Sequence, residues 1–213
     1  MVWDDLTPQQ VLTRGAFLNA AAVQMALGGS TNAAVHLIAM ARRAGVEFAL
    51  DDLDAMGRRV PVIANLFPSG DRLMEDFHYA GGVPALMTRL VAHLSLGERN
   101  VNGKTLGQNL EGVRVLDDEV IRPLERPVSA NGALAVLRGN LAPDGAVMKA
   151  SAASPKFLQH RGRVEEGTAR EDLWRRQVGP HHLHDALAAG GGHARVAGVH
   201  CRNRGRAGQR QAK

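Results

Sequence analysis

Residues 61–82 read PVIANLFPSGDRLMEDFHYAGG. The short apolar run at 62–66 predicts a buried strand, because the proline, serine and glycine at 68–70 that follow it favour a turn. Glu75, Asp76 and His78 come shortly afterwards. Since paired carboxylates beside a histidine can transfer protons, these three side chains are candidate acid–base groups.

Two helices are predicted before this stretch, and they meet at the glycine pair 28–29. Thr7 is a good N-cap, because proline occupies the first helical position and glutamine stands at the third. One helix is therefore expected from Pro8 to Leu27, where the glycine pair ends it. A second helix is expected from Ser30 to Ala44.

Ser30, Thr31 and Asn32, at the start of the second helix, allow two interpretations. Free backbone amides and short polar side chains at a helix N-terminus suit a carboxylate or a phosphate, and the preceding glycines would let a ligand approach closely. The same residues could instead satisfy the unpaired amides of the helix alone. The spacing by itself favours the capping role.

Further helices are predicted downstream by caps and apolar spacing. Asp51 and Asp52 are expected to cap a short helix through Met56. An amphipathic helix is expected over residues 83–96, and Thr105 is expected to cap a brief one.

The pattern changes from helices to strands near Pro127. Short apolar runs at 133–137 and 146–149 predict strands, and Pro-Asp-Gly at 143–145 predicts a turn between them. We therefore expect two domains that are divided near Pro127.

Composition limits the class of protein. The chain of 213 residues has one cysteine, Cys201, which excludes an internal disulfide and an all-cysteine metal site within one chain. No apolar run approaches the roughly 20 residues that a membrane-spanning helix needs, and the acidic N-terminus lacks a secretory signal. These features predict a cytoplasmic protein with no membrane partner.

Residues 164–213 have a different composition, rich in arginine, glycine and histidine and without apolar periodicity. His181, His182 and His184 invite a metal-site interpretation, yet the composition around them is typical of an out-of-frame reading of a GC-rich gene. We expect this tail to be disordered or non-native. A basic nucleic-acid-binding protein that acts through the tail is the alternative of another class, but interleaved aromatic residues are lacking, so nucleic acid is not the expected partner.

Four stretches in fixed order carry a resemblance to a known family. They are LGGSTNA at 27–33, PSGDRLMEDFHYAGG at 68–82, VNGKT at 101–105, and RGNLAPDGAV at 138–147 continuing to QHRG at 159–162. Together they resemble the dihydroxy-acid dehydratase and phosphogluconate dehydratase family (IlvD/Edd) over residues 6–163. Two stretches, residues 65–82 and EVIRPL at 119–124, resemble the family's sugar-acid dehydratases, of the arabinonate and xylonate type, more than its branched-chain amino-acid enzyme.

The resemblance implies an α/β fold. Residues 1–127 would be the end of an N-terminal α/β domain, mostly helical here, and residues 128–163 would be the first strands of a β-barrel-like C-terminal domain. It also implies a homo-oligomeric hydro-lyase, a dimer or a tetramer, which removes water from a 2,3-dihydroxy acid to give a 2-keto acid. An iron–sulfur cluster, Mg²⁺ and a base serine serve this chemistry in the family.

The motifs that supply those metal ligands and that serine are expected to lie outside this chain, so no catalytic or metal-ligating residue is assigned. We expect a fragment that is inactive alone and acts on a small dihydroxy acid, a sugar acid such as arabinonate. A dihydroxy-acid dehydratase of branched-chain amino-acid synthesis remains the alternative. With the reaction assigned to metals and a serine, Ser30, Thr31, Asn32, Glu75, Asp76 and His78 become candidates for substrate-binding or supporting residues that border the site.

Overall fold

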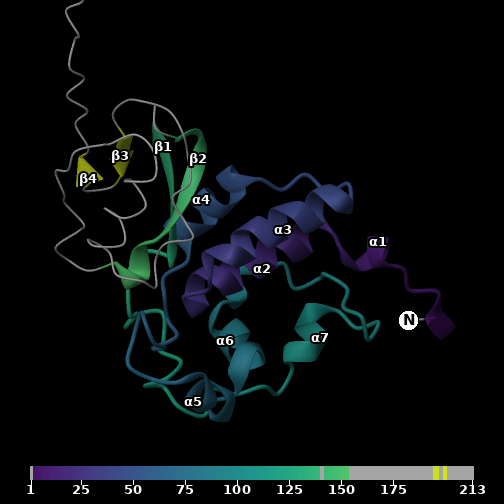
Figure 1. Cartoon of the computed structure of the whole chain (residues 1–213). Coiled ribbons are helices and arrows are strands. Elements are labelled where there is room, and N and C mark those ends of the chain that lie inside the picture. Colours follow the sequence, from purple (N-terminus) through teal and green to yellow (C-terminus); the bar gives the residue numbers. More distant parts are fainter. Residues whose placement is uncertain (1, 140–141, 154–193, 197–198, 201–213) are drawn as a thin grey trace, which may run out of the picture. The chain divides into compact units, whose positions relative to one another are not determined.

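The computed structural model describes residues 2–139, 142–153, 194–196 and 199–200 (Figure 1). The chain divides into two compact units, residues 1–136 with 148–152 and residues 137–147 with 153–213. The α-helices are α1 (Pro8–Val11), α2 (Arg14–Leu27), α3 (Thr31–Arg43), α4 (Leu50–Arg59), α5 (Met74–Tyr79), α6 (Gly82–Arg89) and α7 (Leu106–Leu110). Short 3-10 helices lie at η1 (Val2–Asp4), η2 (Val91–His93) and η3 (Ala150–Ala152).

Helix α2 is the centre of the first unit. It packs against α3, α4 and α6, and Figure 1 shows it alongside α3. Its small residues Ala21, Ala22 and Ala26 are fully buried, which allows these neighbours to approach closely. The Phe17 ring contacts the Phe48 ring with centroids 5.7 Å apart. This unit therefore has a hydrophobic core of its own.

The segment 62–66 lies in that core, but it is not the regular strand that its sequence predicts. Val62, Ile63 and Ala64 are fully buried. Their backbone pairs only through isolated bridges, Val62 with Ser129 and Ala64 with Ile121. The carbonyl of Ala26, at the end of α2, accepts hydrogen bonds from the amides of both Ile63 and Ala64. The segment is extended and hydrogen-bonded, yet its partners come from separate parts of the chain, so no ladder forms.

The single helix predicted from Pro8 to Leu27 is wrong in one respect, because the structure breaks it into α1 and α2. The Thr7 capping box is confirmed, with the Thr7 amide donating to Gln10 Oε1 at 2.9 Å. Thr13 then takes an extended conformation, and its hydroxyl accepts from the Ala16 amide at 3.1 Å. A second N-cap within the apolar run therefore restarts the helix.

Other local signals had mixed outcomes. Ser30 caps α3 and Thr105 caps α7, as predicted. Helix α4 starts at Leu50, and Asp52 closes its first turn by accepting from the Ala49 amide. The helix predicted over 83–96 ends at Arg89 and continues only as η2. The Leu90 amide donates to the Met87 carbonyl, three residues back, so the α-helix tightens into a 3-10 turn there.

An arginine–carboxylate contact joins the starts of α2 and α4. The Arg14 guanidinium donates to Asp52, with Nη2 and Oδ1 2.6 Å apart. This hydrogen bond raises the pKa of Arg14, with further support from the negative charge of Asp52. Arg14 therefore stays charged and holds the starts of the two helices together.

The strands are β1 (Leu134–Gly139), β2 (Ala142–Lys149), β3 (Ala194–Val196) and β4 (Val199–His200), in the sheet order β2-β1-β3-β4. β1 pairs antiparallel with β3, with Arg138 opposite Arg195. The predicted turn at 143–145 is wrong, since these residues lie inside β2, where Gly145 has a φ of 98°. Helices followed by strands confirm the α/β class, and the barrel-like completion of the sheet stays a prediction.

No helix within the described ranges is long and apolar enough to cross a membrane. The predicted disorder of residues 164–213 lies outside the described residues except at β3 and β4. The histidines at 181, 182 and 184 lie outside them entirely.

Candidate functional site

The turn at 68–70 is built by Asn65, whose side chain is 5% exposed. Its amide nitrogen donates to Asp71 Oδ1 at 2.7 Å and to the Glu119 carbonyl at 3.2 Å. A Cβ at Gly70 would lie 2.2 Å from Asn65 Oδ1, so only glycine fits beside the amide. One buried side chain thus fixes the shape of the turn that carries Ser69.

Ser69 joins two stretches that are remote in sequence. Its hydroxyl lies 2.7 Å from the hydroxyl of Ser151 in η3, a hydrogen bond in which either can donate. On the other side, a Cβ built on Gly28 would be 3.1 Å from Ser69 Oγ. The Ser151 amide donates to the Ala133 carbonyl at 3.2 Å, which holds η3 in place. The structure therefore brings together Gly28, Ser69 and Ser151, which we call the serine junction.

The candidates Ser30, Thr31 and Asn32 begin α3 just after this junction. Ser30 acts as the N-cap, with its hydroxyl accepting from the Asn32 amide at 3.2 Å. The buried side chain of Gln24 donates to the Ser30 carbonyl at 2.9 Å and so braces the turn from below. Thr31 is 8% exposed, whereas Ser30 and Asn32 are exposed. Capping accounts for Ser30, and ligand binding by the three residues stays a prediction.

The candidates Glu75, Asp76 and His78 lie on α5. Asp76 accepts from the Leu73 amide at 2.8 Å and closes the first turn of that helix. His78 is exposed, and its ring meets the edge of the Tyr79 ring with centroids 5.6 Å apart. Among the described residues, no hydrogen bond or ion pair joins two members of this trio. A role for them in a site stays a prediction.

Sequence reasoning did not single out Ser69 or Ser151 as site residues. Ser69 was quoted only as part of a family stretch, and Ser151 follows the stretch that ends at residue 147. The two lie 82 residues apart, so their contact depends on the tertiary fold. The glycine at 28, with a φ of 76°, was the available signal that the backbone there approaches something closely.

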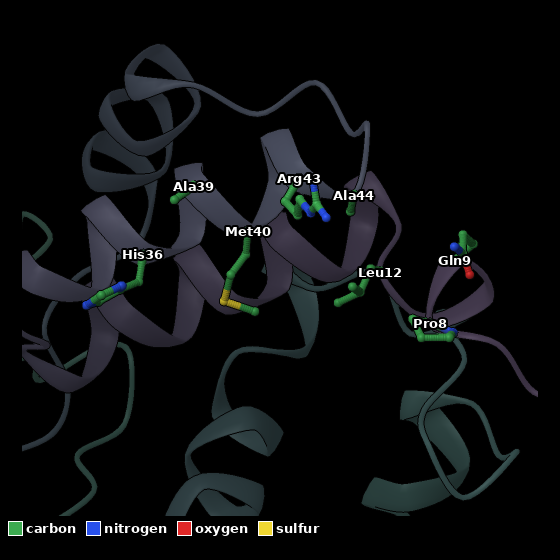
Figure 2. A pocket seen from close by; sticks show the side chains of 8 residues that line it. All are labelled: Pro8, Gln9, Leu12, His36, Ala39, Met40, Arg43 and Ala44. Carbon is green, nitrogen blue, oxygen red and sulfur yellow. The ribbon is translucent and has the colours of Figure 1, made fainter.

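A shallow pocket of about 450 Å³ lies between α1 and α3. Figure 2 shows His36, Ala39, Met40 and Arg43 on its α3 wall. It contains no carboxylate, and none of the candidate residues lines it. The pocket is therefore separate from the serine junction.

The resemblance implies an iron–sulfur cluster and a Mg²⁺ ion, each of which needs several donor side chains. Within the ranges that the structure describes, no group of three or more His, Cys, Asp or Glu side chains could hold a metal ion. The described residues thus do not fit an iron–sulfur cluster or a Mg²⁺ site. No chemical step is assigned to either group here.

Comparison with known proteins identifies the family. Residues 1–109 match the model of the dihydroxy-acid/6-phosphogluconate dehydratase N-terminal domain, and residues 119–203 match that of the C-terminal domain. The chain therefore belongs to the dihydroxy-acid/6-phosphogluconate dehydratase family. The second range extends beyond residue 163, where the quoted sequence motifs end. The predicted boundaries near Pro127 and residue 164 stay predictions.

Several curated relatives are similar over most of this chain. A 6-deoxy-6-sulfo-D-gluconate dehydratase of Pseudomonas putida is 50% identical over 76% of the chain. An L-arabinonate dehydratase of Rhizobium leguminosarum is 48% identical over 77%, and a dihydroxy-acid dehydratase of Caldicellulosiruptor bescii is 46% identical over 76%. These matches cover 28%, 29% and 30% of the respective relatives. The chain thus spans about three-tenths of the length of the relatives it matches.

Proposed function

We propose that this chain is part of a hydro-lyase that dehydrates a 2,3-dihydroxy acid, specifically a sugar acid such as arabinonate, to a 2-keto-3-deoxy acid. The observation that carries the proposal is the serine junction. It joins the LGGSTNA stretch, the PSG turn and the segment just after β2 at one place within a family of dehydratases. A cluster of motifs that converge in space is the arrangement expected beside a site.

The overall reaction requires loss of a C2 proton and of the C3 hydroxyl, which leaves as water after protonation, followed by conversion of the resulting enol to the ketone. Neither serine of the junction is assigned the proton transfer, because among the described residues no base lies within a recorded hydrogen bond of either hydroxyl. Their hydroxyls can donate to and accept from a polyhydroxy acid. We therefore assign them to the border of the site, together with Ser30, Thr31 and Asn32.

The chain alone is proposed to be inactive, because no catalytic residue and no metal ligand is assigned within it. We assign no ligand of the iron–sulfur cluster or of the Mg²⁺ ion to the described residues. We further propose that the protein is cytoplasmic and forms a homo-oligomer. The family membership and the exposed apolar surface near α5 support the homo-oligomer.

A chimera tests this proposal. Residues 6–163 replace the matching segment of the L-arabinonate dehydratase, and formation of 2-keto acid is measured with L-arabinonate and with a branched-chain dihydroxy acid. We expect the chimera to dehydrate L-arabinonate and the isolated chain to stay at background. A chimera that assembles like its parent but dehydrates neither acid would contradict the function. Turnover by the isolated chain would contradict its inactivity.

Dehydration of a branched-chain dihydroxy acid is the second candidate. The observation in its favour is the 46% identity to a dihydroxy-acid dehydratase, which is close to the 48% and 50% of the sugar-acid relatives. A chimera that prefers the branched-chain acid over L-arabinonate, compared with its parent, would support this candidate instead.

A further inference from the structure

Arg122 is a partly buried cation that forms no ion pair with a carboxylate of the described residues. Its Nε atom is buried and has no hydrogen-bond partner within the described residues. Arg122 is partly exposed, and no hydrogen bond joins its two terminal nitrogens to another described residue, so the outer edge of the guanidinium reaches solvent. The guanidinium thus has its inner nitrogen in the protein and its outer edge open. An unpaired charge that has lost part of its hydration destabilises the fold.

The other half-buried arginine of the described part, Arg89, provides the comparison. Its guanidinium is bonded to the Asp118 carboxylate. The other arginines in the range 2–139 are exposed, where water can hydrate the charge. Arg122 therefore differs from them all in combining partial burial with the lack of a carboxylate.

The backbone holds Arg122 in a fixed place. Its amide donates to the Ile63 carbonyl at 2.9 Å, next to the bridge between Ala64 and Ile121. It therefore lies opposite the central segment that leads into the Asn65 turn. The acid three residues before it, Glu119, is already bonded to Arg126 at 2.7 Å. Glu125, three residues after it, is exposed, and within the described residues no ion pair joins it to Arg122. With neither neighbouring acid bonded to it, the guanidinium is available to an external anion.

We propose that Arg122 binds the oxyanion of a small acid at the outer edge of its guanidinium. The planar fork of an arginine matches a carboxylate or a phosphate with two parallel hydrogen bonds. That the acid is a dihydroxy acid rests on the proposed function. The existence of the oxyanion site rests on the position of Arg122 alone.

Nuclear magnetic resonance of the complete 213-residue chain tests the proposal, with D-gluconate and inorganic phosphate as probes and sodium chloride at equal ionic strength as reference. The Nε–H signal of Arg122 is assigned as the one lost in Arg122→Lys. We expect it to shift and to saturate with one probe or both, more than with chloride. Gluconate alone would indicate a carboxylate site, and phosphate alone a phosphate site. A signal that responds equally to all three salts would overturn the proposal.

Thermal unfolding of matched variants gives an independent measurement. The effective anion should raise the Tm of the wild type by roughly 5 °C near saturation. Arg122→Met should lose this rise without a lower Tm in chloride, whereas Arg89→Met should have a lower Tm but keep the rise. The same rise in Arg122→Met as in the wild type would overturn the proposal. Anion binding without dehydration by the chimera would refute the proposed function and leave the oxyanion site standing.

Discussion

Gly28 shows how much one residue determines at the serine junction. It has a φ of 76°, and a Cβ there would meet Ser69 Oγ at 3.1 Å. Gly45 has nearly the same φ, 71°, but nothing within 4 Å of its Cβ position. A comparison of substitutions at the two glycines therefore separates two free-energy costs, that of a left-handed backbone and that of steric crowding.

We expect Gly45→Ala to lower the free energy of unfolding by about 1 kcal/mol, because alanine resists the left-handed region. Gly28→Ala should cost about 2–3 kcal/mol, because the methyl group also pushes against Ser69. Urea unfolding of both variants measures the difference. Equal losses would mean that Ser69 moves aside freely and that the junction is not tightly packed.

At the same scale, sequence patterns identified the residues with local roles. Ser30, Thr105 and the Thr7 capping box were predicted because a cap and its helix lie within a few residues. The pairing of Ser69 with Ser151, and the lack of an anion beside Arg122, depend on segments far apart in the chain. Neither has a local pattern that would predict it.

At the scale of elements, α4 and the segment that enters β1 touch backbone to backbone. The Gly132 amide donates to the Gly57 carbonyl at 2.8 Å. A Cβ on Gly132 would meet Gly57 Cα at 2.9 Å and the Val60 carbonyl at 3.0 Å. Because backbone atoms cannot swing away as a flexible side chain does, any side chain there must separate the two elements.

We therefore expect Gly132→Ala to lower the free energy of unfolding by about 2–4 kcal/mol through overpacking. Gly97→Ala is the matched control, since nothing lies within 4 Å of a Cβ at that exposed position. Circular dichroism during denaturant unfolding provides the measurement. A loss of under 1 kcal/mol at Gly132 would show that α4 shifts at little cost.

The elements also show where sequence patterns stop being informative. Helix formation follows apolar spacing and caps, so most helices were expected near their observed places. The single helix to Leu27 and the strand at 62–66 were not found as predicted, for different reasons. Thr13 offers a local cap that the apolar period conceals, whereas the 62–66 segment lacks a continuous partner strand.

At the scale of the whole molecule, several exposed apolar side chains lie close together in sequence on and beside α5. Phe67, Leu73, Met74 and Tyr79 are 76%, 64%, 62% and 68% exposed. We call these four residues the α5 patch. Neighbouring exposed apolar side chains of this size mark surfaces that other protein covers. The patch is therefore expected to drive association of the purified chain.

Light scattering over a range of concentrations measures this association. The wild type should form oligomers or larger species, and a variant with both Met74→Ser and Tyr79→Ser should associate less. Val101→Ser, which removes one apolar side chain that is 60% exposed, should leave association unchanged. A wild-type chain that stays a monodisperse monomer at all concentrations would contradict the expectation.

The hydrogen bonds of Asn65 have a consequence for chain length. They tie residue 65 to residue 71 and also to the carbonyl of residue 119, so the loop between 65 and 71 is closed at a fixed number of residues. An added residue would break that closure. An epitope tag or fluorescent reporter should therefore not be inserted between residues 65 and 71.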